Sequence, residues 1–372
     1  MLLPRLLWHA ASASAARGTA HPCARRGVVT AAVAGQQRLY IVDMLPMIHK
    51  AVALAASNAA AINQQYQQQQ YQHAGGEQGA AHQVMASLLD LLRRSQEPPT
   101  HMAVVVDVPG PTFRQLKYPQ YKGKRPPTPP GLHQQLACVL ALVDAAAIPI
   151  LAVPGVEADD VLGSLAARAA RDGFDVMLVS PDKDMYQLLQ PRVRILRSIS
   201  GSWAPYSCED FAAEYGLQPG QERLWVDVKA LAGDPADNIP GVKSIGQKTA
   251  LQLVQQLGSV DSILQSCQAQ QQPEQLQQVK LRKQQLQILA SAEGAAAATF
   301  AKQLVTIVTD LKHPPVWQPW SNFELRVPPD GGELAVQRAV NMKLTWTAAR
   351  LRDLFQQWAK QDSQQAAMAQ HW

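Results

Sequence analysis

The first 42 residues contain neither aspartate nor glutamate, although arginine recurs there at positions 5, 17, 25, 26 and 38. Alanine and serine fill the intervals, and the run LLPRLLWHAASASAARG can form an amphipathic basic helix. This composition is typical of an organelle transit peptide, so we expect residues 1–35 to direct the chain to a mitochondrion or chloroplast. A disordered basic tail is the alternative. Removal of residues 1–35 would lower the formal net charge from +5 to +1, so overall basicity is weak evidence for a nucleic-acid partner.

Two other absences narrow the class of protein. No run of about 18 apolar residues is free of charge, so the sequence predicts no membrane span. The four cysteines, Cys23, Cys138, Cys208 and Cys267, lie far apart and show no zinc or redox spacing. They indicate free thiols in a reducing compartment. No internal repeat of fixed period is present.

Apolar strand-like runs alternate with helical segments over residues 36–205. The strands are expected at 39–43, 101–107, 148–153, 175–180 and 192–198, and the helices near 83–94, 131–146, 157–173 and 184–190. This alternation predicts an α/β domain with a mostly parallel central sheet flanked by helices. A Gln- and Gly-rich stretch at 63–82 reads as an insertion between the first strand and the next helix.

The pattern changes to helical after about residue 206. We expect a helical C-terminal domain over 206–310 and a C-terminal extension over 311–372. The composition beyond residue 361 predicts a partly disordered tail.

Nine carboxylates in a fixed order are the strongest chemical signal. Most of them end an apolar strand-like run or open the segment after it, where parallel strands form a ligand crevice. They would repel one another there unless hard divalent cations bound, and two such ions can clamp a phosphodiester for hydrolysis. Any one of them alone could be a helix cap or a turn. The nine are Asp43, Asp107, Glu157, Asp159, Asp160, Asp182, Asp184, Asp234 and Asp237.

A second motif, IPGVKSIGQKTA at 239–250, precedes the apolar-periodic LQLVQQL. Its glycines bracket a tight turn before a helix, and such a helix–turn–helix presents backbone N–H groups to a phosphate. An ordinary helical hairpin is the alternative. The residues predicted to contact duplex are Gly241, Val242, Lys243, Ser244, Gly246, Lys248 and Thr249.

A third motif interleaves aromatic and basic residues between Thr112 and Arg125. Bases stack and phosphates pair with such residues in single-strand grooves, although a solvated basic loop has similar composition. The residues of interest are Arg114, Tyr121, Lys122, Lys124 and Arg125.

Together these motifs resemble the 5′-nuclease family, which includes the 5′→3′ exonuclease domain of bacterial DNA polymerase I, phage 5′-nucleases and flap endonucleases. The segments PGVEADDVLGSLA, DKDMYQLL, GDPADNIPGVKSIGQKTA and FRQLKYPQYKGKRPP carry the resemblance, which covers about residues 38–310. The chain is similar to the stand-alone organellar 5′→3′ exonucleases of plants and algae, since no polymerase sequence follows these motifs.

The resemblance implies roles for these positions. The first metal group comprises Asp43, Asp107, Glu157, Asp159 and Asp160, and the second comprises Asp182, Asp184, Asp234 and Asp237. Lys122 is implied to reach the scissile phosphate from the base of a helical arch near 112–130, Arg125 and Arg114 are implied basic residues of the arch and active site, and Tyr121 is implied to stack on DNA. The 239–250 motif is implied to be a helix-hairpin-helix that holds duplex, often with K⁺. Two Mg²⁺ or Mn²⁺ ions are the implied cofactors.

The implied function is a structure-specific 5′→3′ exonuclease or 5′-flap endonuclease in organelle DNA replication and repair. Its partners would be 5′ flaps, nicked or gapped duplex and RNA-primed ends, with no membrane, a monomeric state and contacts to organellar replication proteins. Two departures stand out: Met44 replaces the usual glycine, and His49-Lys50 stand where Tyr-Arg is expected. A non-catalytic DNA-junction binder and a PIN-type ribonuclease remain alternatives.

Overall fold

The computed structural model describes residues 36–65, 79–94, 97–199, 202–269, 279 and 281–370. The predicted transit peptide, most of the Gln- and Gly-rich insertion and part of the Gln-rich segment after residue 269 lie outside the described residues.

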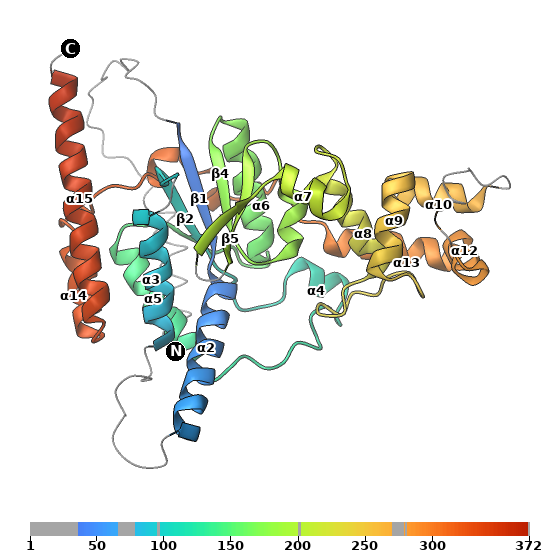
Figure 1. Cartoon of the computed structure of the whole chain (residues 1–372), viewed down its shortest axis with the longest axis horizontal. Helices are drawn as coiled ribbons and strands as arrows, with labels where there is room; N and C mark the ends of the chain where they lie inside the picture. Colours follow the sequence, from blue (N-terminus) through green and yellow to red (C-terminus); the bar gives the residue numbers. More distant parts are fainter. Residues whose placement is uncertain are drawn as a thin grey trace.

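A six-stranded sheet forms the centre of the larger part of the molecule (Figure 1). Its order is β3 (Ile150–Leu151), β2 (His101–Val105), β1 (Arg38–Asp43), β4 (Asp175–Val179), β5 (Val193–Ile199) and β6 (Ser202–Tyr206). The first five strands are parallel and β6 is antiparallel to β5. The predicted mostly parallel sheet is therefore confirmed. Strand β6 was not predicted: Pro205 interrupts its run, and proline is tolerated in a strand at the sheet edge, where no N–H is needed.

Alternate residues of each strand enter separate cores because side chains in a strand point to opposite faces. One face carries Leu39 and Ile41 against α6 (Ala158–Arg171) and the 3₁₀ helix η1 (Lys183–Leu188). The other carries Tyr40 and Val42 against three helices, which are α2 (Met44–Gln65), α3 (Gly79–Arg94) and α5 (Leu132–Ala145). Because helices pack on both faces of the sheet, the carboxyl ends of its strands are held in fixed positions along one edge.

The predicted arch segment between β2 and α5 is mostly non-helical. Only α4 (Phe113–Lys117) is helical, and turns and extended backbone follow as far as Gly131. The prolines at 126–130 explain the difference, because proline lacks the N–H that a helix interior requires. In Figure 1 this segment runs from α4, below the sheet, back toward α5.

A helical part follows the sheet and lies at one end of the molecule (Figure 1). It comprises η2 (Glu222–Leu224), α7 (Cys208–Tyr215), α8 (Trp225–Ala232), α9 (Gln247–Leu257), α10 (Val260–Gln268), α12 (Lys283–Ala290) and α13 (Ala292–Val305). An aromatic cluster joins it to the sheet: the Tyr186 ring stacks on Tyr206 with centroids 5.0 Å apart and also contacts Trp225 at 5.7 Å. This contact fixes α8 relative to the carboxyl ends of β4 and β5.

The C-terminal extension contains two short 3₁₀ helices, η3 (Pro314–Trp317) and η4 (Trp320–Asn322), and then α14 (Glu333–Asn341) and α15 (Thr345–Gln370). Helices α14 and α15 pack on α5 and α3, at the end of the molecule opposite α9–α13 (Figure 1). Helix α15 continues to Gln370, so the backbone is helical beyond residue 361, where the composition predicted disorder.

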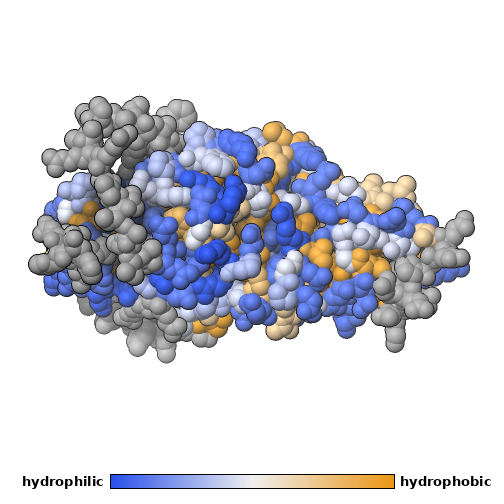
Figure 2. Space-filling view, turned by 90° about the horizontal axis from the view of Figure 1, so that it is seen from above, coloured by the Kyte–Doolittle hydropathy of each residue, from blue (hydrophilic) through white to orange (hydrophobic). Residues whose placement is uncertain are grey.

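None of the described helices is both long and apolar enough to cross a membrane. The face seen in Figure 2 is largely hydrophilic, and its hydrophobic side chains lie in separate small groups.

Candidate active site

The carboxylates that follow β1, β2 and β4 meet at one edge of the sheet because these neighbouring strands are parallel. Asp43 is the last residue of β1, and its Oδ2 accepts a hydrogen bond from Ser180 Oγ, just after β4, at 3.0 Å. Asp107, after β2, accepts from the backbone N of Ala158 at 2.8 Å. This bond docks the start of α6 against β2 and so brings Glu157 and Asp159 to the same edge.

Burial at this edge opposes the ionised form of the acids. It raises the pKa of Asp43 to about 7, and the charge of Asp107 adds to the shift. Burial likewise raises the pKa of Asp107, and it raises the pKa of Asp159 well above its usual range with a further contribution from Asp43. Within the part of the chain that the structure describes, none of these three acids forms a salt bridge. A bound cation would therefore restore their ionised state at neutral pH.

A basic segment faces the other carboxylates. Lys122 Nζ donates to Glu157 Oε1 at 2.6 Å, and Arg125 donates to Asp237 Oδ1 from Nε at 3.1 Å and from Nη2 at 2.5 Å. The backbone N of Lys122 also donates to the carbonyl O of Asp237 at 2.8 Å, and Lys122 adopts a left-handed φ of 58°. The side chains of Lys122 and Arg125 stay 20% and 50% exposed, so both remain accessible from solvent.

The predicted roles of Arg114 and Asp160 need correction, because these two side chains pair with each other. Arg114 donates to both oxygens of Asp160, at 2.6 and 2.8 Å, and is 2% exposed. Asp160 is fully buried and also accepts from the backbone N of Val308 at 2.8 Å. Further bonds from Arg114 to the carbonyls of Leu304 and Thr306 tie α4 to α13. In this arrangement Arg114 is a structural anchor, and Asp160 does not offer a free oxygen to a metal.

The predicted role of Tyr121 also needs correction. Its side chain is 4% exposed, and its hydroxyl lies 3.0 Å from Glu157 Oε2 and 3.3 Å from Asp237 Oδ2. The predicted stacking of this ring on a base is incompatible with that burial. Lys124, in contrast, is exposed.

A second acidic cluster lies where α8 approaches η1. Ligand oxygens of Asp184, Asp234 and Asp237 all lie within 4.8 Å of one another, a spacing that suits a hard divalent ion. Lys229 of α8, which the sequence analysis missed, donates to Asp184 and, at 2.6 Å, to Asp234 Oδ2. Burial raises the pKa of Asp184 to about 6 despite Lys229, whereas the pKa of Asp234 is lowered because the Lys229 bond outweighs burial. The only sequence signal for Lys229 is a lysine on a helix five residues before Asp234.

The turn between α8 and α9 explains the glycines of the second motif. A Cβ on Gly241 would lie 2.3 Å from the backbone of Ala232 and Gly233, so the two chain segments can approach only without it. Val242 is 2% exposed and its N–H bonds to Leu231, so neither group is free for DNA, which corrects that prediction. Of the other residues predicted to contact duplex, Lys243, Ser244, Gly246 and Lys248 are exposed, and Gly241 and Thr249 are half-buried.

The two positions at which the sequence departs from the family pattern differ in burial. Met44, the first residue of α2, is fully buried in the core, which gives its side chain a packing role. His49 and Lys50 are both exposed on α2.

The donor set fits divalent metal ions. The carboxylates supply hard oxygen ligands, they lie on three strand ends and one helix start, and several have pKa values that a cation would lower. Asp184, Asp234 and Asp237 suit one ion. The charge of Asp182 acts on Asp43 and on Asp159, which places Asp182 beside the first predicted group as well as beside the second, to which the sequence assigned it.

Comparison with known proteins gives the same assignment for both parts of the chain. Residues 38–216 match the 5'-3' exonuclease N-terminal resolvase-like domain, and residues 221–326 match the 5'-3' exonuclease C-terminal SAM fold. The chain is 44% identical over 179 residues to the thermostable DNA polymerase I of Thermus thermophilus, and 39% identical over 216 residues to DNA polymerase I of Bacillus subtilis. These matches cover 47% and 58% of this chain but only 20% and 23% of the two polymerases.

A solved structure shares the fold over a larger part of the chain. The bacteriophage T5 D15 flap endonuclease, in a complex with DNA and metal ions, superimposes with a TM-score of 0.53 at 17% identity. The comparison covers 86% of this chain and 100% of the phage chain. With both domain matches in sequence order and the carboxylates gathered at one edge, the chain belongs to the 5'-3' exonuclease family.

Proposed function

We propose that this chain is a structure-specific nuclease that hydrolyses DNA phosphodiester bonds at 5′ ends and 5′ flaps. The observation that carries the proposal is the meeting of two carboxylate groups beside partly exposed Lys122 and Arg125. Such a site can hold a phosphodiester, whereas a binding module needs no buried, mutually repelling acids. The T5 neighbour, solved with DNA and metal ions, supports the same substrate class.

Two divalent ions, Mg²⁺ or Mn²⁺, would supply charge neutralisation of the phosphate and activation of water when bound. The chain's own residues orient those ions and the strand. Ser180 holds Asp43 by its hydroxyl, and the backbone of Ala158 holds Asp107, so their oxygens are fixed before substrate arrives. Lys122 and Arg125 can leave Glu157 and Asp237 for a phosphate, because the side chains of these two cations are partly exposed although their carboxylate partners are buried. They would offset charge that develops on the phosphate oxygens.

The turn between α8 and α9 is proposed to act as a helix-hairpin-helix that grips duplex by its backbone. Lys243 and Lys248 are exposed there, and the N-terminus of α9 favours an anion. A K⁺ ion at this turn and a monomeric state belong to the same proposal.

Cleavage of a 5′-labelled DNA flap by the full chain tests this function. We expect cutting near the junction with Mg²⁺ and none with EDTA. Matched flaps with RNA in place of DNA distinguish a PIN-type ribonuclease, which would prefer RNA. Tight junction binding without cutting under any metal would instead support a non-catalytic binder.

The role in organelle DNA replication and repair, with removal of RNA primers and flaps, is proposed from the basic, acid-free first 42 residues. A fusion of residues 1–42 to a fluorescent protein tests it. Import into mitochondria or plastids supports the proposal, and a diffuse signal in the cell contradicts it.

A further inference from the structure

Two carboxylates of the second acidic cluster, Asp234 and Asp237, lie in one tight turn between α8 and α9. The turn is closed by a pair of backbone hydrogen bonds between Asp234 and Ile239, at 2.9 and 2.8 Å. Asn238 lies within it at a left-handed φ of 55°. Asparagine tolerates this conformation better than most residues. The turn therefore accounts for the backbone of Asn238, and the role of its side-chain amide has to be sought elsewhere.

The amide of Asn238 reaches out of the turn to the arch segment. Its Nδ2 donates to the backbone carbonyl O of Gln120 at 2.8 Å, and the nitrogen must face this partner because a carbonyl can only accept. In the opposite direction, the backbone N of Lys122 donates to the carbonyl O of Asp237 at 2.8 Å. These two bonds join the base of the arch segment to the turn that carries Asp237.

Lys122 has a backbone conformation that lysine rarely adopts, with a left-handed φ of 58°. Such a conformation persists only where neighbouring groups hold it in place, and it is common at functional sites. Gln120 begins the tight turn that contains Lys122, and its carbonyl O accepts from the backbone N of Gly123 at 3.0 Å as well as from Asn238. The Asn238 amide thus fixes the peptide group on which the conformation of Lys122 depends.

The conformation of Lys122 determines where its ammonium lies. Nζ donates to Glu157 Oε1 at 2.6 Å, at the start of α6 and beside the acidic centre. Arg114 anchors the preceding part of the arch segment to α13, through the carbonyls of Leu304 and Thr306. If the bond from Asn238 were lost, the peptide group of Gln120 could rotate, Lys122 could relax to an ordinary negative φ, and its ammonium would leave this position.

We propose that Asn238 is a positioning residue for the nuclease reaction. Its amide holds the carbonyl of Gln120, and with it the left-handed turn at Lys122, so that the Lys122 ammonium stays where the phosphate is cleaved. Asn238 acts through Lys122 and does not touch the phosphate itself. The proposal rests on the proposed function, since it assigns Lys122 to the cleaved phosphate.

The test uses two variants of the full chain. Asn238→Gly removes the amide and keeps the left-handed backbone accessible, because glycine adopts positive φ without strain. Asn238→Asp keeps the outline of the side chain and removes the N–H donor. Each variant is measured in three ways without cleavage, which are hydrogen–deuterium exchange of residues 120–125, the affinity for flap DNA in EDTA, and the Tm. Single-turnover flap cleavage with Mg²⁺ is the fourth measurement.

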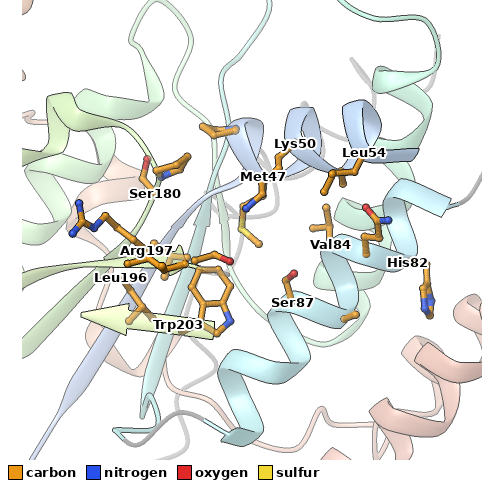
Figure 3. A pocket seen from close by; sticks show the side chains of 18 residues that line it. Met47, Lys50, Leu54, His82, Val84, Ser87, Ser180, Leu196, Arg197 and Trp203 are labelled. Carbon is orange, nitrogen blue, oxygen red and sulfur yellow. The ribbon is translucent and has the colours of Figure 1, made fainter. Parts of the chain in front are cut away.

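Two matched controls place glycine elsewhere. Lys343→Gly changes another left-handed residue, with a φ of 58°, in the C-terminal extension. Ser87→Gly weakens α3 at the wall of the cavity between α2 and α3, where Ser87 lies near Val84 and Met47 (Figure 3). No residue of 112–130 or 234–239 lines that cavity. This second control shows what a general loss of stability does to the arch segment.

For Asn238→Gly we expect exchange over residues 120–125 to become about fivefold faster, the scale of one lost hydrogen bond. Single-turnover cleavage should fall by about tenfold or more, because a small displacement of a catalytic cation is costly. The affinity for flap DNA in EDTA and the Tm should stay at their wild-type values. Asn238→Asp should exchange as fast as Asn238→Gly over these residues. Both controls should keep wild-type exchange there and wild-type cleavage, although Ser87→Gly lowers the Tm.

Wild-type exchange over residues 120–125 in both Asn238 variants would overturn the proposal, and so would faster exchange with unchanged cleavage. A loss of cleavage by Asn238→Gly that merely accompanies a lower Tm or a weaker affinity for the flap would assign Asn238 to folding or binding instead. These results would leave the proposed function intact, because wild type would still cleave the flap. Failure of wild type to cleave under any metal would reject both.

Discussion

The ammonium of Lys229 donates to Asp234 Oδ2 at 2.6 Å and so lies between members of the second acidic cluster. The same amine also bonds Asp184, and Arg125 bonds Asp237. Each carboxylate of this cluster is thus held by a side-chain cation, whereas Asp43, Asp107 and Asp159 form no salt bridge within the described residues. The two candidate metal positions differ in whether an ion must displace a protein cation.

Replacement of Lys229 by methionine should strengthen metal binding at the second cluster. The methionine keeps the apolar stem and removes the competing charge, so we expect about tenfold tighter binding of Mn²⁺ there, the scale of one charge-assisted hydrogen bond. Calorimetric titration without DNA measures it. Lys243→Met, on the exposed turn, is the control. An unchanged affinity in K229M would show that Lys229 does not compete with the ion.

Asp159→Asn should remove catalysis without removing DNA binding. The carboxylate lies at the acidic centre and its loss weakens the hold on an ion, so flap cleavage should fall by about a hundredfold or more. Binding of flap DNA in EDTA should stay equal or tighten, because one negative charge near the phosphate is gone. Wild-type turnover by this variant would contradict the assignment of Asp159 as a metal ligand.

Arg114→Met should act on stability. Removal of this guanidinium leaves Asp160 charged, fully buried and without its cation, which costs about 3–5 kcal/mol in the free energy of unfolding. Arg125→Met is the matched control: its side chain is half-exposed, so the expected loss is below about 1 kcal/mol while cleavage falls. Urea unfolding and flap cleavage of the two variants measure both quantities. A stable R114M that has lost cleavage would point to a direct role of Arg114 instead.

The stability of the metal-free protein should fall with rising pH. The folded-state pKa of Asp43, about 7, lies above its ordinary value, so the folded state binds this proton more tightly than the unfolded state. The stability from Asp43 is full below about pH 4 and is lost as the pH rises through about 7. Because Mg²⁺ needs the ionised acid, the increase in Tm that it causes should be larger near pH 8 than near pH 5.5. An equal increase at both pH values would rule out this linkage, and Asp43→Asn should reduce it.

Lys248→Glu should weaken binding to all duplexes alike. Lys248 is exposed in the first turn of α9, where it can contact a phosphate and no base edge. We expect the slope of log affinity against log salt to flatten by about one unit, with no change in sequence preference. Titrations of two unrelated duplex sequences at several salt concentrations measure both. A sequence-dependent loss would argue for base contacts.

Much of the fold and of the acidic centre could be predicted because each depends on local pattern. Apolar runs ending in Asp43 and Asp107 identify strands and also their carboxyl ends, and parallel strands place those ends at one edge. Strand β6 was not predicted because proline, here Pro205, is uncommon in strands. The arch segment is largely non-helical because its prolines lack the backbone N–H groups that a helix requires.

Which side chains pair with one another within the site could not be predicted, because the partners lie far apart in the chain. Periodicity and residue type are enough to specify the α/β class, the order of the domains and the presence of nine acids. Packing of distant segments is what pairs Arg114 with Asp160, buries Tyr121 on Glu157 and brings Lys229 into the second cluster. Burial turns a surface cation or ring into a structural partner, and burial is a property of the packed chain, which no local pattern specifies.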